Sequence, residues 1–191
     1  MRKVIAGMQS SLDGKIEGPD GYADWVDAWS DNYDVMSRVD ACLLGGGMYP
    51  GYEQYWTGVQ EGPDKPSPMT GKAPTPGEVE YARFAAQTPH YVLSSTLTSA
   101  LWTHTSFVRG LDEVAALKQQ PGKGIYLVGG ARTVASLIDA GLVDELRLTV
   151  HPVIAAEGKA LFATAERRRG LKLRKVQQPE NGLVSLVYGL A

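Results

Sequence analysis

The chain has 191 residues, a formal net charge of −2, a hydrophobic fraction of 43% and a charged fraction of 21%. These values are typical of a globular protein, and the near-neutral charge gives no electrostatic reason to expect a nucleic-acid partner. No apolar stretch is as long as a membrane span, no signal-peptide core is present, and the single Cys42 cannot form an internal disulfide. We therefore expect a soluble, cytoplasmic protein with no membrane partner.

The first half of the chain predicts two strands, two helices and two loops. Val4–Met8 is an apolar run typical of a central strand, and Gln9–Tyr22 is expected to be a long loop because it holds three glycines and a proline. Asp27–Val39 has apolar residues at helical spacing and predicts an amphipathic helix. Asp40–Leu44 predicts a strand that ends in Gly45–Gly47, and Met48–Trp56 predicts a short aromatic helix.

The stretch Thr57–Gly77 carries five prolines and four glycines, so we expect either an ordered loop or a mobile lid. Beyond it, helices and strands alternate again. The expected helices are Glu78–Ala86, Leu111–Lys118 and Ala131–Ala140, and the expected strands are His90–Leu93, Ile125–Val128, Glu145–Val150, Leu171–Gln177 and Leu183–Tyr188. The last two strands form a hairpin through Pro179–Gly182. This order predicts one α/β domain over residues 1–191, with a mixed, mainly parallel sheet and an antiparallel edge.

The most informative segment is Ile125–Leu148, in which a strand, two glycines and a helix follow one another. Gly129 and Gly130 allow backbone N–H groups to approach a ligand closely, and the helix dipole favours an anion at its N-terminus. Arg132 and Thr133 add a cation and a hydroxyl in the first turn. The alternative interpretation, that the two glycines only turn the chain, has equal weight on this segment alone.

Three further loops follow strands and are expected to meet this segment at one edge of the sheet. They are Gln9–Lys15, Gly45–Tyr49 and Ser94–Thr98, which offer glycines or hydroxyls. Because ligands of open α/β sheets collect at the carboxyl ends of the strands, the four loops together predict a site for a phosphate-rich ligand such as a dinucleotide.

Three motifs give the chain a family resemblance. SLDGKIEGPDG (Ser11–Gly21) resembles the first loop of the dihydrofolate reductase-like superfamily, in particular the reductase domain at the C-terminus of bacterial riboflavin-biosynthesis deaminase-reductases. YVLSSTL (Tyr91–Leu97) resembles the adenosine-side loop of that family, and Ile125–Ile154 resembles its most recognisable stretch. The resemblance implies a three-layer α/β/α fold of the dihydrofolate reductase type and a reductase that takes hydride from NADPH.

The resemblance also implies roles for particular residues. Asp13 would lie beside the nicotinamide and the substrate, as a hydrogen-bonding or proton-supplying catalytic group, with Ser11 near the substrate. The residues implied to bind the cofactor are Gly45, Gly46, Ser94, Ser95, Thr96, Val128, Gly129, Gly130, Ala131, Arg132 and Thr133. Two positions depart from the family pattern: Gly46 stands where an arginine is usual, and Ser95 where some members have another arginine. A missing guanidinium removes a charge-assisted contact worth about 1.5–3 kcal/mol, so the choice between NADPH and NADH stays open.

The substrate side is expected near the first helix. True dihydrofolate reductases bind the pterin ring through a carboxylate there, for which Asp31 is the best placed of Asp27, Asp31 and Asp34, although a solvated helix face explains these aspartates equally well. Several aromatic residues in this part of the chain could bind a flat heterocycle or could pack in the core. They are Trp25, Trp29, Tyr49, Tyr52, Tyr55 and Trp56.

The function expected from all of this is an NADPH-dependent reductase of a ribosylamino-pyrimidine or a pterin-like compound. The alternatives are a catalytically silent nucleotide-binding protein of the same fold and a reductase that uses NADH or flavin. His90, His104 and His151 lack metal-ligand spacing, so no metal site is expected. The apolar faces of the C-terminal hairpin favour a homodimer.

Overall fold

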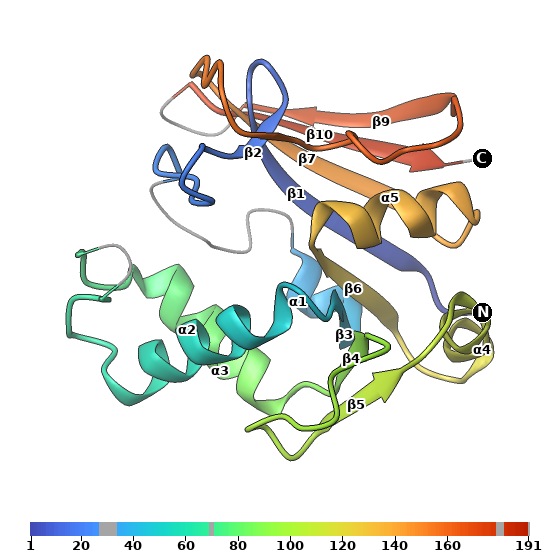
Figure 1. The fold of residues 1–191 in the computed structure, drawn as a ribbon, viewed down its shortest axis with the longest axis horizontal. Coiled ribbons are helices and arrows are strands. Elements are labelled where there is room, and N and C mark those ends of the chain that lie inside the picture. The colour runs from blue at the N-terminus through green and yellow to red at the C-terminus, as the bar shows by residue number, and fades with distance from the viewer. Residues whose placement is uncertain (27–33, 69–70, 179–181, 191) are drawn as a thin grey trace.

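A sheet of eight strands forms the centre of the molecule, in the order β5-β4-β3-β6-β1-β7-β10-β9 (Figure 1). The computed structural model describes residues 1–26, 34–68, 71–178 and 182–190. The strands of this sheet are β1 (Val4–Ser11), β3 (Val39–Gly45), β4 (His90–Leu93), β5 (Thr105–Val108), β6 (Gly124–Gly129), β7 (Glu145–His151), β9 (Leu171–Gln177) and β10 (Val184–Leu190). A small second sheet pairs β2 (Lys15–Glu17) with β8 (Lys159–Ala160).

The strands from β5 to β7 run parallel, whereas β10 is antiparallel to both β7 and β9. The predicted mixed, mainly parallel sheet with antiparallel C-terminal strands is therefore confirmed. The predicted loop Gln9–Tyr22 was wrong in two places. Gln9 and Ser11 pair with Thr149 and His151 and so extend β1, and Lys15 begins the short strand β2. These pairings are made across the sheet, so no local pattern of residues signals them.

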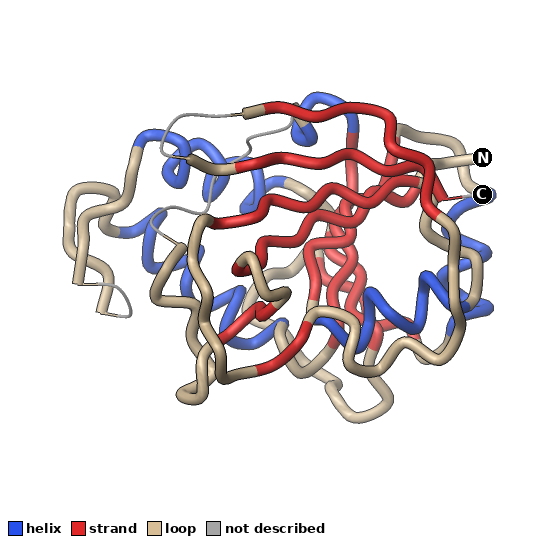
Figure 2. Tube along the Cα trace, turned by 90° about the horizontal axis from the view of Figure 1, so that it is seen from above, coloured by secondary structure: helices blue, strands red, loops and turns tan. Residues whose placement is uncertain are grey.

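Helices cover both faces of the sheet (Figures 1 and 2). On one face lie α1 (Val35–Arg38), α2 (Tyr49–Glu61) and α3 (Pro76–Gln87), and on the other lie α4 (Leu111–Gln119) and α5 (Ala131–Asp139). In the described ranges, no helix combines the length and the apolar character needed to cross a membrane.

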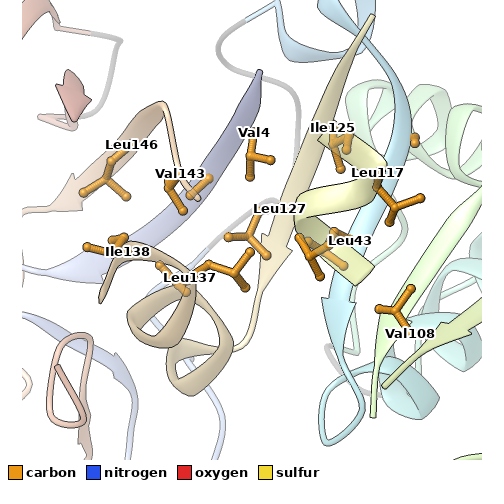
Figure 3. Packing of buried hydrophobic residues seen from close by; sticks show 14 residues of the cluster. Val4, Leu43, Val108, Leu117, Ile125, Leu127, Leu137, Ile138, Val143 and Leu146 are labelled. Atoms are coloured by element: carbon orange, nitrogen blue, oxygen red, sulfur yellow. The ribbon is translucent and has the colours of Figure 1, made fainter. Parts of the chain in front are cut away.

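The two faces of the sheet bury different side chains. Against α4 and α5 the core is aliphatic, and Leu43, Leu127 and Leu137 meet between sheet and helix with no exposed surface (Figure 3). Against α2 and α3 it is aromatic, with Tyr49, Tyr52, Trp56 and Tyr81 packed beside the fully buried Cys42. Successive residues of a strand point to opposite faces, so Cys42 and Leu43 enter different cores.

Three predicted boundaries are corrected by the structure. The α2 helix starts at Tyr49 and continues to Glu61, past the predicted end at Trp56; Pro50 lies in its first turn, where the missing N–H costs nothing. The α3 helix already begins at Pro76, where Thr75 and Glu78 form a capping box, so the proline-rich loop is confined to residues 62–75, apart from the undescribed 69–70. Of the predicted helix Asp27–Val39, residues 27–33 lie outside the described ranges; Val35–Arg38 is helical, and Val39 is already in β3.

Candidate functional site

A cavity of about 1040 Å³ lies at the carboxyl ends of β1, β3, β4 and β6. Its lining comes from residues 7–9 of β1, from β6, and from the loops that follow β3, β4 and β6, together with residues 21–23 and parts of β2, β8, α2, α3 and α5. Of the predicted loop Gln9–Lys15, only Gln9 contributes to the lining. The structure brings together in this one cavity every residue that the sequence predicted to bind the cofactor. The convergence follows from the parallel strands, whose carboxyl ends share one edge of the sheet.

The N-terminus of α5 forms one wall of the cavity. Gly130 is its N-cap and offers no side chain to accept a hydrogen bond from the first amides, and the first turn holds no acidic residue. Gly129 has a φ of 144°, a conformation open to glycine, and a Cβ there would lie 3.2 Å from Met48 Sδ. Because α5 is anchored by its buried apolar face, its N-terminal N–H groups are held at the cavity with the exposed Arg132 beside them, and this arrangement could hold an anion.

The loops after β3 and β4 touch each other across Gly46. A Cβ at this position would lie 2.6 Å from Ser94 Cβ, which is too close for any side chain. At Gly45, a Cβ would collide with Thr133 Oγ1 at the start of α5. The glycine that replaces the usual family arginine therefore has a steric cause, since the Ser94 side chain fills that space.

The Ser94 loop is held in shape by a cation that the sequence did not indicate. Arg109 Nη1 donates hydrogen bonds to the carbonyl oxygens of Ser94 (2.6 Å) and Leu97 (2.9 Å), and its guanidinium lies 5.5 Å from the centre of the Phe107 ring. Ser94 Oγ accepts the N–H of Leu97 at 3.0 Å. Arg109 directly follows β5, a strand that was not predicted, so nothing in the local sequence linked it to this loop.

The other end of the cavity is aromatic. Tyr22, Tyr52, Tyr55, Trp56, Tyr81 and Tyr126 all contribute to the lining. The sequence left open whether Tyr52 and Trp56 belong to the core or to a ligand site. Both are core residues, 6% and 5% exposed, and both also line the cavity, so the ligand-site interpretation stays a prediction. Tyr81 and Tyr126 were not predicted, because a single tyrosine on a helix or strand carries no recognisable signal. In the described part of the lining, the only carboxylate is Glu17, which is ion-paired with Lys159 at 3.0 Å.

Asp13 lies outside the cavity lining. Its Oδ1 accepts hydrogen bonds from Ser11 Oγ (2.7 Å) and from the N–H of Ala155 (2.9 Å), and its Oδ2 accepts the N–H of Ala156 (2.9 Å). The Ser11 hydrogen bond, followed by those of the backbone, lowers the pKa of Asp13 to about 2. These hydrogen bonds favour the ionised carboxylate, which joins two loops, and the catalytic role expected of Asp13 stays a prediction.

Two other predicted substrate residues, Ser11 and Trp25, also lie outside the cavity lining. Ser11 is 1% exposed and its hydroxyl is used by Asp13 and by the N–H of Lys15. Trp25 packs beside Gly18 and is not part of the lining, and Asp31 lies outside the described residues.

The histidines show one unexpected proximity. The rings of His90 and His104 lie 5.6 Å apart, although the sequence separates them widely, while His151 ends β7 and contacts Gln9 Oε1 at 2.7 Å. Over the described ranges, no cluster of three or more His, Cys, Asp and Glu side chains is placed to hold a metal ion.

Comparison with known proteins gives consistent likenesses. The sequence profile of the RibD C-terminal domain matches residues 2–185. YyaP of Bacillus subtilis (strain 168), itself uncharacterised, is 34% identical over 191 residues, which cover 98% of this chain and 94% of that protein.

Two solved structures are similar in fold. The diaminohydroxyphosphoribosylaminopyrimidine deaminase/5-amino-6-(5-phosphoribosylamino)uracil reductase of Thermotoga maritima has a TM-score of 0.63 at 17% identity, over all of this chain and 57% of that chain. Dihydrofolate reductase from Enterococcus faecalis, complexed with NADP(H), has a TM-score of 0.60 at 14% identity, over 98% of this chain and 96% of that chain. The expected dihydrofolate reductase-like fold is thus confirmed.

Proposed function

Because the chain belongs to the RibD C-terminal domain family, we propose that it is an NADPH-dependent reductase of a small heterocycle, either a ribosylamino-pyrimidine or a pterin-like compound. One observation carries the proposal: a single cavity has the N-terminus of α5, which favours an anion, on one wall and an aromatic lining at its other end. Such a cavity suits a dinucleotide and a flat ring bound side by side.

The residues of the cavity fit a nicotinamide dinucleotide. The uncapped amides of α5 and Arg132 would hold the pyrophosphate, and Ser94, Ser95 and Thr96 would lie near the adenosine ribose and its 2′-phosphate. Arg109 brings a positive charge against the Ser94 loop, although Gly46 and Ser95 bring none. NADPH, when bound, supplies a hydride at the nicotinamide ring.

The chain itself would orient the heterocycle and exclude water from it. Trp56 and the tyrosines of the aromatic end offer flat faces for stacking. Gly7 leaves room for the Tyr126 ring, since a Cβ there would lie 2.5 Å from Tyr126 Oη. With Asp13 ionised, water remains as the proton source for the reduced ring.

The test is a thermal-shift titration with NADPH, NADH and FMN, followed by an assay of NADPH oxidation with candidate pyrimidines and dihydrofolate. At a ligand concentration of about 100 Kd, binding stabilises the fold by about 2.7 kcal/mol, which raises Tm by about 5–10 °C for a chain of this size. No shift with either dinucleotide contradicts the proposal.

The same titration distinguishes the alternatives. NADPH binding without oxidation of any heterocycle would identify a silent nucleotide-binding protein. A shift with NADH or FMN that exceeds the shift with NADPH would identify a reductase that uses another cofactor.

A further inference from the structure

Three buried rings form a hydrogen-bonded chain at the aromatic end of the cavity. Tyr81 on α3 and Tyr52 on α2 have their hydroxyl oxygens 3.0 Å apart, and Tyr52 Oη lies 3.3 Å from His90 Nε2 at the start of β4. His90 Nδ1 lies 2.7 Å from the carbonyl oxygen of Thr88. Tyr81, Tyr52 and His90 are 7%, 6% and 0% exposed, so bulk water does not replace these contacts.

The donors and acceptors in this chain have only one consistent arrangement. A carbonyl oxygen accepts hydrogen bonds and never donates, so His90 Nδ1 must carry the ring proton. Burial lowers the pKa of His90 to about 4, which keeps the imidazole neutral and leaves Nε2 as an acceptor. Tyr52 therefore donates its hydroxyl proton to His90.

The direction then passes to the next ring. Tyr52 has no second proton, so in its contact with Tyr81 it must accept, and Tyr81 donates. The thiol of Cys42 also contacts the Tyr52 hydroxyl, but sulfur is a much weaker acceptor than an imidazole nitrogen and does not reverse the order. With its one proton committed, the Tyr81 oxygen has only lone pairs left to offer.

Both tyrosines belong to the lining of the cavity. We propose that Tyr81 is a specificity-determining residue that accepts a hydrogen bond from a ring N–H of a neutral, flat heterocycle and so selects rings with a free N–H over their N-alkylated counterparts. This inference rests on the proposed function, because it assumes that the aromatic end receives the substrate ring. Tyr81 is a neutral acceptor, and the carboxylate of the described lining, Glu17, is already paired with Lys159.

The experiment compares two probes, one with ring N–H groups and one in which methyl groups replace them. Lumazine has ring N–H groups as its only donors, and 1,3-dimethyllumazine has none. Their dissociation constants are measured by calorimetry on the full chain, with and without NADPH. We expect the wild-type protein to bind lumazine at least about tenfold more tightly, the usual effect of pairing a buried acceptor.

Variants separate hydrogen bonding from the bulk of the methyl groups. Tyr81→Phe should weaken lumazine binding about tenfold and leave 1,3-dimethyllumazine unchanged, so that the preference disappears. Tyr49→Phe is the matched control: its hydroxyl is also buried and donates to Glu53 Oε1 at 2.8 Å, but it does not line the cavity, so the preference should persist.

Tyr52→Phe tests the direction of the chain and also decides the matter if Tyr81→Phe does not fold. It keeps the Tyr81 oxygen but releases its proton, which becomes available to a ring carbonyl, so binding of 1,3-dimethyllumazine should improve and the preference should fall. An unchanged preference in Tyr81→Phe and Tyr52→Phe, or no binding of either probe to the wild type, overturns the inference. If NADPH does not bind but the preference for lumazine persists, the proposed function is contradicted and the inference about Tyr81 is not.

Discussion

Gly130 both lines the cavity and forms the N-cap of α5. As the N-cap it needs no side chain, and nothing closer than Met48 Cβ, at 3.9 Å, faces a substituent there. Aspartate and asparagine are both better N-caps than most residues, so neither substitution should weaken the helix. They differ in charge, which makes this position a clean probe of anion binding.

We expect Gly130→Asp to lower the affinity for NADPH at least about tenfold, because a carboxylate would face the pyrophosphate across a short distance. Gly130→Asn, of nearly the same shape, should lose much less, and Tm without ligand should stay near the wild-type value in both. Fluorescence titration with NADPH measures the effect. Equal affinity in the two variants would contradict the phosphate-site assignment.

Asp13 contributes to stability through its charge. Its pKa is lowered from the ordinary 3.8 to about 2 in the folded chain, so its stabilising effect is complete above pH 3.8 and is lost as the pH falls through about 2. We expect Asp13→Asn to be less stable than the wild type at pH 7, and the difference to fade on acidification across that window. Urea unfolding at a series of pH values measures it.

The same variant also tests chemistry. If Asp13 only joins the loops, reductase activity of Asp13→Asn at neutral pH should fall by less than about tenfold. A loss of several orders of magnitude with intact NADPH binding would restore the catalytic role that the resemblance implied.

At the scale of elements, the site depends on how closely the loops after β3 and β4 pack. Gly46 meets Ser94 with no space for a methyl group, whereas at the neighbouring Gly47 no atom lies within 4 Å of the position that a Cβ would take. A side chain is therefore sterically excluded at Gly46 but has open space at the adjacent Gly47.

We expect Gly46→Ala to cost about 1–3 kcal/mol of unfolding free energy, the usual range for overpacking, and Gly47→Ala to cost less than about 0.5 kcal/mol. Adding Ser94→Gly to Gly46→Ala should recover part of the loss, since it removes the atoms in conflict. Urea unfolding of the three variants decides the matter, and equal costs at both glycines would show that the loops are not in contact.

At the scale of the whole molecule, an ion pair between the buried Lys118 and the half-buried Asp144 lies at the end of the sheet opposite the cavity. Lys118 Nζ on α4 contacts Asp144 Oδ2 and the carbonyl oxygen of Leu142, each at 2.6 Å, and Asp144 Oδ2 also accepts the N–H of Val4 at 2.7 Å. The side chain of Lys118 is only 5% exposed, so these partners take the place of water around its ammonium group.

We expect Asp144→Ala to cost about 3–5 kcal/mol of unfolding free energy, because it leaves a buried ammonium without its counter-charge. Asp144→Asn, which keeps an acceptor, should cost less. The dissociation constant of NADPH for the folded protein should not change, since the pair lies at the amino ends of the strands. Denaturation and ligand titration together check both statements, and a tenfold weaker affinity would refute the separation.

The edge strand β9 is relevant to the expected homodimer. The edge strand β9 exposes Leu171, Leu173 and Val176. The homodimer expected from the hairpin stays a prediction, which light scattering of the wild type and of Val176→Lys would test: the substitution should shift a dimer towards monomer.

Much of the fold was predictable because its signals are local. Apolar runs such as His90–Leu93, the glycine pair at Gly129 and the paired C-terminal strands identified most elements, and the parallel order implied that their loops would meet. Boundaries failed where pairing or capping decides them, as at Ser11, which belongs to β1 only through its register with His151, and at Pro76, which starts a helix through the Thr75 cap.

By itself, the sequence determined the order of most elements, the α/β class and the glycine and hydroxyl loops of the cavity, because hydrophobic periodicity and turn residues act within a few positions along the chain. The short strands β2, β5 and β8 were not predicted. Only the tertiary structure decided that Asp13 joins two loops outside the cavity, that Arg109 supports the Ser94 loop, and that Tyr81 ends a hydrogen-bonded chain. Each of these depends on a contact between distant segments. The direction of a hydrogen bond or the pKa of a carboxylate is set by such neighbours in space, which no local pattern of residues records.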